Sequence, residues 1–136
     1  METMLPRILV VDDEPSLRRL YHRALAGRGF VVTEAPSGLA ALDLVNEGFS
    51  VIVTDYGMPG MNGVEFIRAV RARGIQTPVL IVSGEFNADD VEGALPPGIV
   101  AVLRKPILIE EFLDAVFTAS GIAPIAEAQH SPLPNG

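Results

Sequence analysis

The chain has 136 residues, the length of one domain with a substantial buried core. Its 17 acidic and 10 basic side chains give a net charge of −7, which argues against binding nucleic acid or an anionic membrane surface. The absence of cysteine excludes disulfides, thiolate metal sites and cysteine nucleophiles. No apolar run approaches the ~18 residues that span a bilayer, and the first residues lack the basic start of a signal peptide, so we expect a cytoplasmic protein.

Short aliphatic runs alternate with segments of helical period as far as residue 119. The runs are almost continuously apolar, which is typical of parallel strands buried on both faces. They predict five strands, at 8–11, 30–33, 51–54, 79–82 and 99–103. The helical segments predict five helices, one after each strand. This alternation predicts a doubly wound α/β domain over residues 5–119, with a parallel sheet between two helical layers.

Local signals support the ends of these helices. In the first helix, the spacing predicts that Leu17, Leu20 and Ala24 share the buried face. Ser37 is the expected N-cap of the second helix, and Asn62 with Glu65 matches the capping box of the third. The fourth helix, within 87–95, is predicted to be short because two prolines follow it. Residues 120–136 contain three prolines and no periodicity, which indicates a disordered tail or linker.

Ionisable and hydroxyl side chains stand at the carboxyl ends of the predicted strands. Asp12 and Asp13 follow the first strand, and Asp55, Ser83 and Lys105 follow the third, fourth and fifth. In open α/β sheets, ligands bind at these ends, where the strand order reverses. If the reversal lies between the first and third strands, the three carboxylates converge. Such an oxygen-only cluster suits Mg²⁺, and the carboxylate of Asp55 could then act as a nucleophile toward phosphorus.

Four short motifs occur in order, each at a strand end: VVDDEP at 10–15, TDYGMPGMNG at 54–63, VSG at 82–84 and RKP at 104–106. Together they resemble the receiver domain of two-component response regulators, over about residues 5–119. The resemblance implies a flavodoxin-like five-stranded sheet in the order 2-1-3-4-5. It also implies that the chain takes up a phosphoryl group and then switches a partner interaction.

The resemblance also implies a role for each site residue. Asp55 would be the phosphoacceptor, and Ser83 and Lys105 would bind the phosphoryl oxygens, with a cis bond between Lys105 and Pro106. The residues implied to hold Mg²⁺ are Asp12, mainly through water, and Asp13, Asp55 and the carbonyl of Gly57. Receivers catalyse only their own phosphorylation and dephosphorylation, so no enzyme with an external substrate is expected.

The implied phosphoryl donor is a phosphohistidine on a histidine kinase or a histidine phosphotransfer protein. Its docking surface is expected at Pro15, Arg18, His22, Pro106 and Ile107. For the first three of these residues, a plain solvated helix face is an equally good interpretation. The sequence does not identify the downstream protein target, and a homodimer is a further assembly that it allows. Two alternatives compete: an interaction module that works without phosphorylation, and a phosphatase-type hydrolase, which would require its nucleophile on the first strand.

Two departures from the family pattern bear on signalling. Val102 stands where the family usually has the aromatic residue that changes rotamer on activation, and valine is stiff about χ1 and carries no ring. We therefore predict that the segment 84–95 as a whole orders on phosphorylation. Gly57 leaves the approach to Asp55 open to water, which favours a short phosphoryl lifetime, while Glu85 beside that path could act in either direction.

Overall fold

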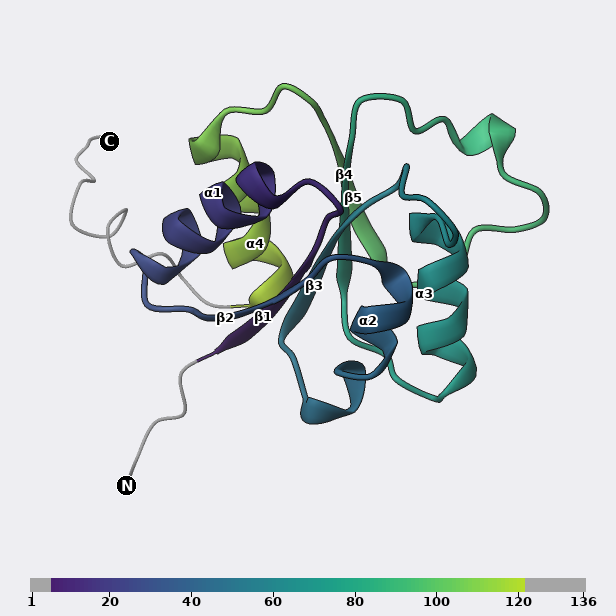
Figure 1. Cartoon of the computed structure of the whole chain (residues 1–136), viewed down its shortest axis with the longest axis horizontal. Helices are drawn as coiled ribbons and strands as arrows, with labels where there is room; N and C mark the ends of the chain where they lie inside the picture. Colours follow the sequence, from purple (N-terminus) through teal and green to yellow (C-terminus); the bar gives the residue numbers. More distant parts are fainter. Residues whose placement is uncertain (1–5, 122–136) are drawn as a thin grey trace.

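The structure, a computed structural model, describes residues 6–121 (Figure 1). Its five strands form one parallel sheet in the order β2-β1-β3-β4-β5, which confirms the doubly wound fold and the strand order that the resemblance implied. The strands are β1 (Arg7–Val11), β2 (Val31–Ala35), β3 (Val51–Asp55), β4 (Val79–Ser83) and β5 (Ile99–Arg104).

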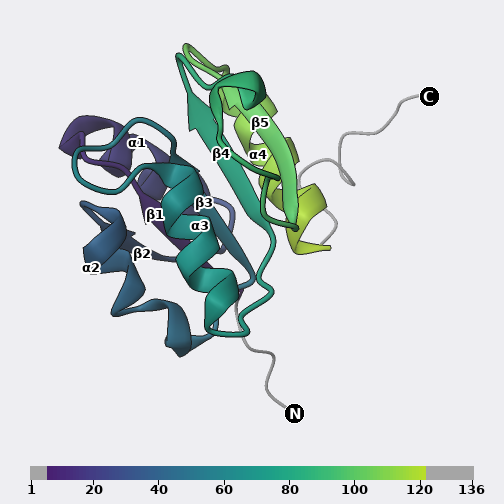
Figure 2. The same ribbon diagram turned by 90° about the vertical axis from the view of Figure 1, so that its right-hand side faces the viewer.

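Helices cover the two faces of this sheet in separate layers (Figures 1 and 2). On one face, α1 (Pro15–Ala26) and α4 (Ile109–Ser120) pack on a core that includes Tyr21 and Phe112, whose rings stack with centroids 4.8 Å apart. On the other face, α2 (Gly38–Leu42) and α3 (Gly63–Ala72) enclose a core around Phe66. The central strands β3 and β4 are buried along their whole length, as their continuous apolar runs predict.

The predicted caps form at two of these helices. The Ser37 hydroxyl accepts a hydrogen bond from the Ala40 N–H at 3.1 Å and begins α2. Asn62 and Glu65 form a reciprocal capping box at α3, with hydrogen bonds of 2.8 and 2.9 Å. Each cap satisfies backbone N–H groups that the first turn of a helix leaves unpaired. These short signals therefore determine where α2 and α3 begin.

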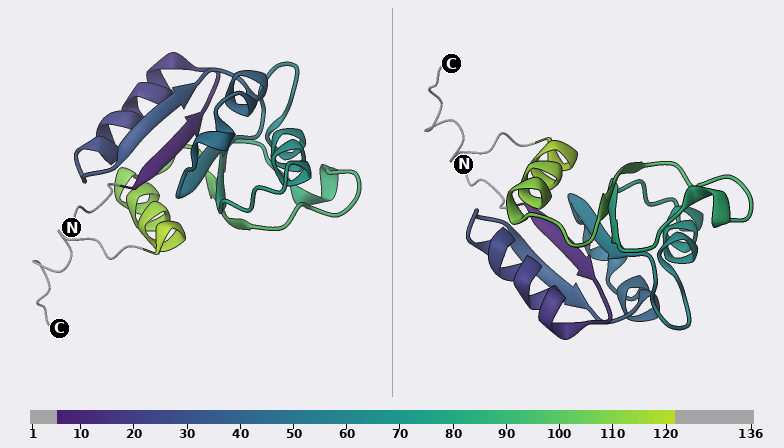
Figure 3. Two further views of the ribbon diagram at one scale, coloured as in Figure 1. Left: turned by 90° about the horizontal axis from the view of Figure 1, so that it is seen from below. Right: turned by 90° about the horizontal axis from the view of Figure 1, so that it is seen from above.

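The prediction of five α-helices is wrong for the described residues, which contain four. In place of the fourth predicted helix, the connection between β4 and β5 has one 3₁₀ turn (Ala88–Asp90) followed by irregular chain. This connection stands out beyond α3, away from α1 and α4 (Figure 3). The segment is rich in acidic residues and poor in large apolar ones, and Gly93 has a φ of +79°, so it has neither the apolar face nor the backbone geometry for a longer helix.

Two arginines of α3 hold the irregular connection through its backbone. Arg68 donates to the carbonyls of Glu92 and Ala94 at 2.6 and 3.1 Å, and Arg71 donates to the carbonyl of Pro97 at 2.8 Å. These three carbonyls lie outside every helix and strand of the described residues. The side chains of α3 therefore give them hydrogen-bond partners that regular secondary structure does not supply.

The predicted buried face of α1 is wrong at Leu20. The buried residues of α1 are Tyr21 and Leu25, whereas Leu20 is 44% exposed.

None of the helices within residues 6–121 is long and apolar enough to cross a membrane. The predicted tail lies outside the described residues from 122 onward.

Candidate functional site

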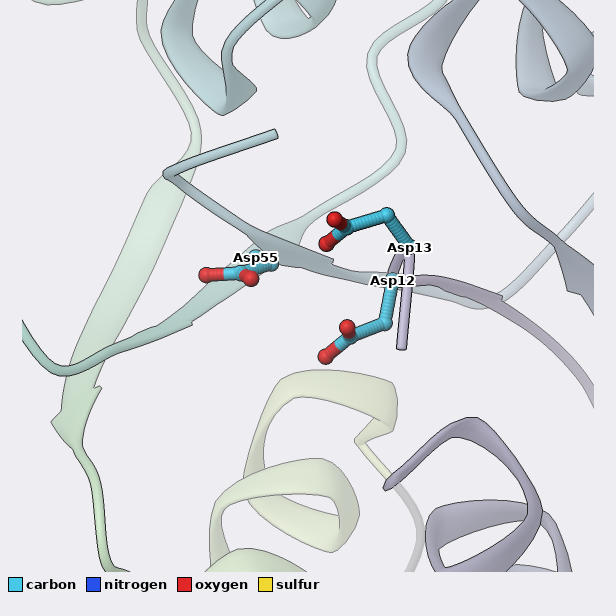
Figure 4. Close-up of side chains that lie close together, drawn as sticks. All are labelled: Asp12, Asp13 and Asp55. Atoms are coloured by element: carbon cyan, nitrogen blue, oxygen red, sulfur yellow. The ribbon is translucent and has the colours of Figure 1, made fainter. Parts of the chain in front are cut away.

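Three carboxylates lie together at the carboxyl end of the sheet (Figure 4). Asp12 and Asp13 directly follow β1, and Asp55 is the last residue of the adjacent β3. One oxygen of each lies within 4.8 Å of one oxygen of the other two. Since β1 is bordered by β2 and β3, whose connections run in opposite directions along the sheet, this is the point where the strand order reverses. The structure therefore brings together the three acids that the sequence placed there.

Asp12 is the most deeply buried of the three, with 2% of its surface exposed. Burial raises its pKa, and the neighbouring charges of Asp55 and Asp13 act in the same direction. The Glu14 N–H, which donates to Asp12 Oδ1 at 2.9 Å, and the charge of Lys105 partly oppose that rise. The negative charge of Asp12 is therefore only partly balanced by its surroundings, and a bound cation would balance it further.

Lys105 reaches the cluster from the loop after β5. Its Nζ lies 3.3 Å from Asp55 Oδ2 and 3.7 Å from Asp12 Oδ2, and its side chain is 25% exposed. The preceding strand brings it there, since the Lys105 N–H donates to the Ser83 carbonyl at 3.0 Å. The bond between Lys105 and Pro106 is cis, as the resemblance implies. An ammonium group therefore faces the carboxylate that is the candidate phosphoacceptor.

Packing fixes the backbone at Asp55. The buried Thr54 hydroxyl donates to the Asp55 carbonyl at 2.9 Å. Gly63, the first residue of α3, lies against the same carbonyl so closely that a Cβ there would collide with it. The sequence shows Gly63 only as part of a loop motif, and the need for glycine at this position comes from that contact. Any larger residue would have to push α3 away from the end of β3.

Ser83 ends β4 and is almost completely buried, with its hydroxyl accepting a hydrogen bond from the Glu85 N–H at 3.1 Å. Gly57 follows β3 by two residues and is exposed, and a Cβ on it would meet open space. Val102 lies on β5 and is 36% exposed. The aromatic contact nearest in the chain to Ser83 is instead between Phe86 and Tyr56, whose rings meet edge to face at 5.0 Å.

The donor set of the pocket fits a hard divalent cation. Carboxylate oxygens from Asp12, Asp13 and Asp55 are the ligands that Mg²⁺ prefers, and the set contains no nitrogen or sulfur donor. Their separation leaves room for one shared ion. Because Asp13 is exposed, water also has access to such an ion, and Mg²⁺ keeps several waters in most protein sites.

The candidate docking residues divide into two groups. Pro106 and Ile107 line an apolar groove of about 490 Å³ between α1 and the start of α4. From the sequence, the other residues that line this groove were not expected to take part in docking. One of them, Leu20, was predicted to be buried. Lys105 connects the groove to the acidic pocket. The remaining lining residues are Leu17, Leu20, Tyr21 and Ile109.

Pro15 is exposed at the start of α1, but Arg18 and His22 are only partly exposed and both contact Glu34 on β2. Arg18 Nε is 3.0 Å from one Glu34 oxygen, and His22 Nδ1 is 2.7 Å from the other. Burial alone would raise the pKa of Glu34, but these hydrogen bonds outweigh it and lower that pKa. The sequence analysis did not identify Glu34 as the partner of Arg18 and His22. The available signal was an acidic residue beside the end of a predicted strand.

Comparison with known proteins agrees with this geometry. The family model for the response regulator receiver domain matches residues 8–117. The chemotaxis protein CheY of Pseudomonas aeruginosa is 37% identical over 118 residues, which cover 82% of this chain and 95% of that protein. The Regulator of RpoS of Escherichia coli K12 is 38% identical over 103 residues, which cover 74% of this chain but 30% of that longer protein.

Solved structures show the same fold. A CheY-like receiver domain protein of Methanospirillum hungatei superposes with a TM-score of 0.78 at 27% identity, covering 85% of this chain and 94% of that one. A receiver domain protein of Clostridium thermocellum gives a TM-score of 0.76 at 28% identity, covering 86% and 95%. With the acidic pocket, the lysine and the strand order all in place, this chain belongs to the response regulator receiver domain family.

Proposed function

We propose that this chain accepts a phosphoryl group on Asp55, with Mg²⁺ held by Asp12, Asp13, Asp55 and the carbonyl of Gly57. The observation that carries the proposal is the convergence of three carboxylates and Lys105 at the ends of adjacent strands. Receiver domains take phosphoryl groups from kinases. The cytoplasm is the proposed location, and a phosphohistidine on a histidine kinase or phosphotransfer protein is the proposed donor.

The chemistry is a displacement at phosphorus. A carboxylate oxygen of Asp55 forms the new P–O bond as the P–N bond to the donor imidazole breaks, and the imidazole nitrogen leaves with the bonding electron pair. Lys105, already 3.3 Å from the acceptor carboxylate, stabilises charge on the phosphoryl oxygens. The Ser83 hydroxyl donates to the same oxygens. Bound Mg²⁺ supplies the further positive charge that these oxygens require.

The product is an acyl phosphate, which water hydrolyses back to the carboxylate. Each cycle returns Asp55 unchanged, so the chain catalyses its own modification and turns over no substrate beyond the phosphoryl donor. The open space beside Gly57 supports water access and a short lifetime for the phosphoryl group. In its phosphorylated form the chain would bind a downstream protein differently.

The apolar groove supports a docking site for the phosphohistidine donor. It begins at Lys105, beside the acceptor, and continues over Pro106 and Ile107 to the exposed Leu20. A donor helix with an apolar face could bury its side chains in this groove while its phosphohistidine enters the acidic pocket. Pro15 flanks the same end of α1.

The experiment uses acetyl phosphate, which needs no partner protein. The full chain is incubated with acetyl phosphate and Mg²⁺, and intact mass is recorded with and without EDTA. We expect a Mg²⁺-dependent gain of one phosphoryl group in the wild type and in Asp114→Asn, a surface acid on α4. The Asp55→Asn variant should gain none. Undiminished labelling of Asp55→Asn would refute the assignment, and a phosphorylation-independent module would show no labelling at all.

A further inference from the structure

Arg18 does not present its guanidinium to solvent but turns it back toward the acidic pocket. Nη1 donates to the Asp12 carbonyl at 2.8 Å, and Nε donates to Glu34 Oε1 at 3.0 Å. The side chain is 16% exposed. A planar guanidinium held at two corners in this way has little freedom to rotate toward a docking partner.

The carbonyl that Arg18 holds belongs to the peptide between Asp12 and Asp13. The other polar groups of Asp12 are also fixed: its N–H donates to the Ala35 carbonyl at 3.2 Å, and its Oδ1 accepts from the Glu14 N–H at 2.9 Å. β1 ends at Val11, so this peptide lies just beyond the strand. Its orientation sets the directions of the Asp12 and Asp13 side chains relative to each other.

Glu34 holds Arg18 in place from the neighbouring strand. One of its oxygens accepts from Arg18 and the other lies 2.7 Å from His22, so the carboxylate is bonded on both sides. A continuous chain of hydrogen bonds therefore runs from β2 through α1 to the turn that carries two of the proposed metal ligands.

We propose that Arg18 is a positioning residue for the Mg²⁺ site: it orients the peptide between Asp12 and Asp13, and Glu34 orients Arg18. This inference rests on the proposed function, because it requires the pocket to bind Mg²⁺. It makes a prediction opposite in sign to simple electrostatics. A positive charge near the pocket repels Mg²⁺, so removing charge alone would tighten binding, whereas removing a positioning contact weakens it.

The test is titration calorimetry of the full chain with MgCl₂. For Arg18→Ala we expect the Mg²⁺ dissociation constant to rise about tenfold, the effect typical of losing a group that orients a metal ligand. Arg18→Lys keeps the charge but lacks the fork, so it should not restore wild-type affinity. Glu34→Gln should give a smaller loss of the same sign. Arg19→Ala removes the same charge from an exposed neighbouring position and should bind Mg²⁺ as well as the wild type or slightly better.

Wild-type affinity in a folded Arg18→Ala variant, checked by far-UV circular dichroism, would overturn the inference while leaving the proposed function intact. Full rescue by Arg18→Lys would overturn the role given to the guanidinium fork, because a side chain without that fork would then position the Asp12–Asp13 peptide equally well. If Arg18→Ala does not fold, Glu34→Gln decides, and an unchanged dissociation constant in that variant counts against the proposal. A wild-type chain that binds no Mg²⁺ would overturn the inference and the proposed function together.

Discussion

Replacing Asp13 by asparagine should stabilise the metal-free protein. Asp13 contributes the third negative charge to a cluster whose oxygens lie within 4.8 Å of one another. Among the described residues, Lys105 is ion-paired with Asp55 and Asp12 but not with Asp13. Two unit charges at about this distance repel by about 0.9 kcal/mol in a water-like dielectric and by about 3.5 kcal/mol at an effective dielectric constant of about 20. Because Asp13 is exposed, the lower figure applies, and relief of both repulsions gives about 1 to 2 kcal/mol.

The assay is urea denaturation followed by far-UV circular dichroism, since the chain has no tryptophan. In EDTA, Asp13→Asn should unfold at higher urea than the wild type, whereas Asp114→Asn, the same charge change on α4, should have little effect. In excess Mg²⁺ the order should reverse, because ligand binding stabilises the native wild type more than the variant. A metal-free Asp13→Asn protein less stable than the wild type would refute the reasoning, as would an equal gain in Asp114→Asn.

Three further predictions concern the surroundings of the pocket. Leu20→Glu should slow phosphotransfer from a phosphohistidine donor at least severalfold while leaving acetyl phosphate labelling unchanged; equal slowing of both would place the defect in the pocket rather than in docking. The pKa of Glu34 is lowered in the folded state, so the wild type should be more stable than Glu34→Gln at neutral pH, and this difference should be lost as the pH falls through that lowered pKa. Urea titrations that give the same stability difference at every pH would contradict this. Backbone NMR relaxation should show residues 84–95 mobile in the free protein and ordered with beryllofluoride and Mg²⁺, and a segment rigid in both states would exclude it as the switch.

Most of the fold could be predicted because its signals are local. Continuous apolar runs predicted all five strands, and side-chain capping signals predicted the starts of α2 and α3. The acidic pocket was predictable for a related reason. Parallel strands bring their carboxyl ends to one edge of the sheet, so acids that follow β1 and β3 meet regardless of their distance in sequence.

The failures depend on tertiary contacts that the sequence does not display. The connection between β4 and β5 is held by Arg68 and Arg71 from another helix, and no local pattern predicts that arrangement. On α1, Leu20 has the spacing of a core residue but lies over the groove beside Pro106. The guanidinium of Arg18 could not be placed without knowing that β2 brings Glu34 beside it.

The central claim is that Asp55 itself receives the phosphoryl group, and reductive trapping tests it most directly. The chain is phosphorylated with acetyl phosphate and Mg²⁺, then treated with borohydride, which converts an aspartyl phosphate to homoserine, and its peptides are sequenced by mass spectrometry. The account predicts homoserine at position 55, and only in samples that contained Mg²⁺. Homoserine at Asp12 or Asp13, or at position 55 with EDTA present, would contradict it.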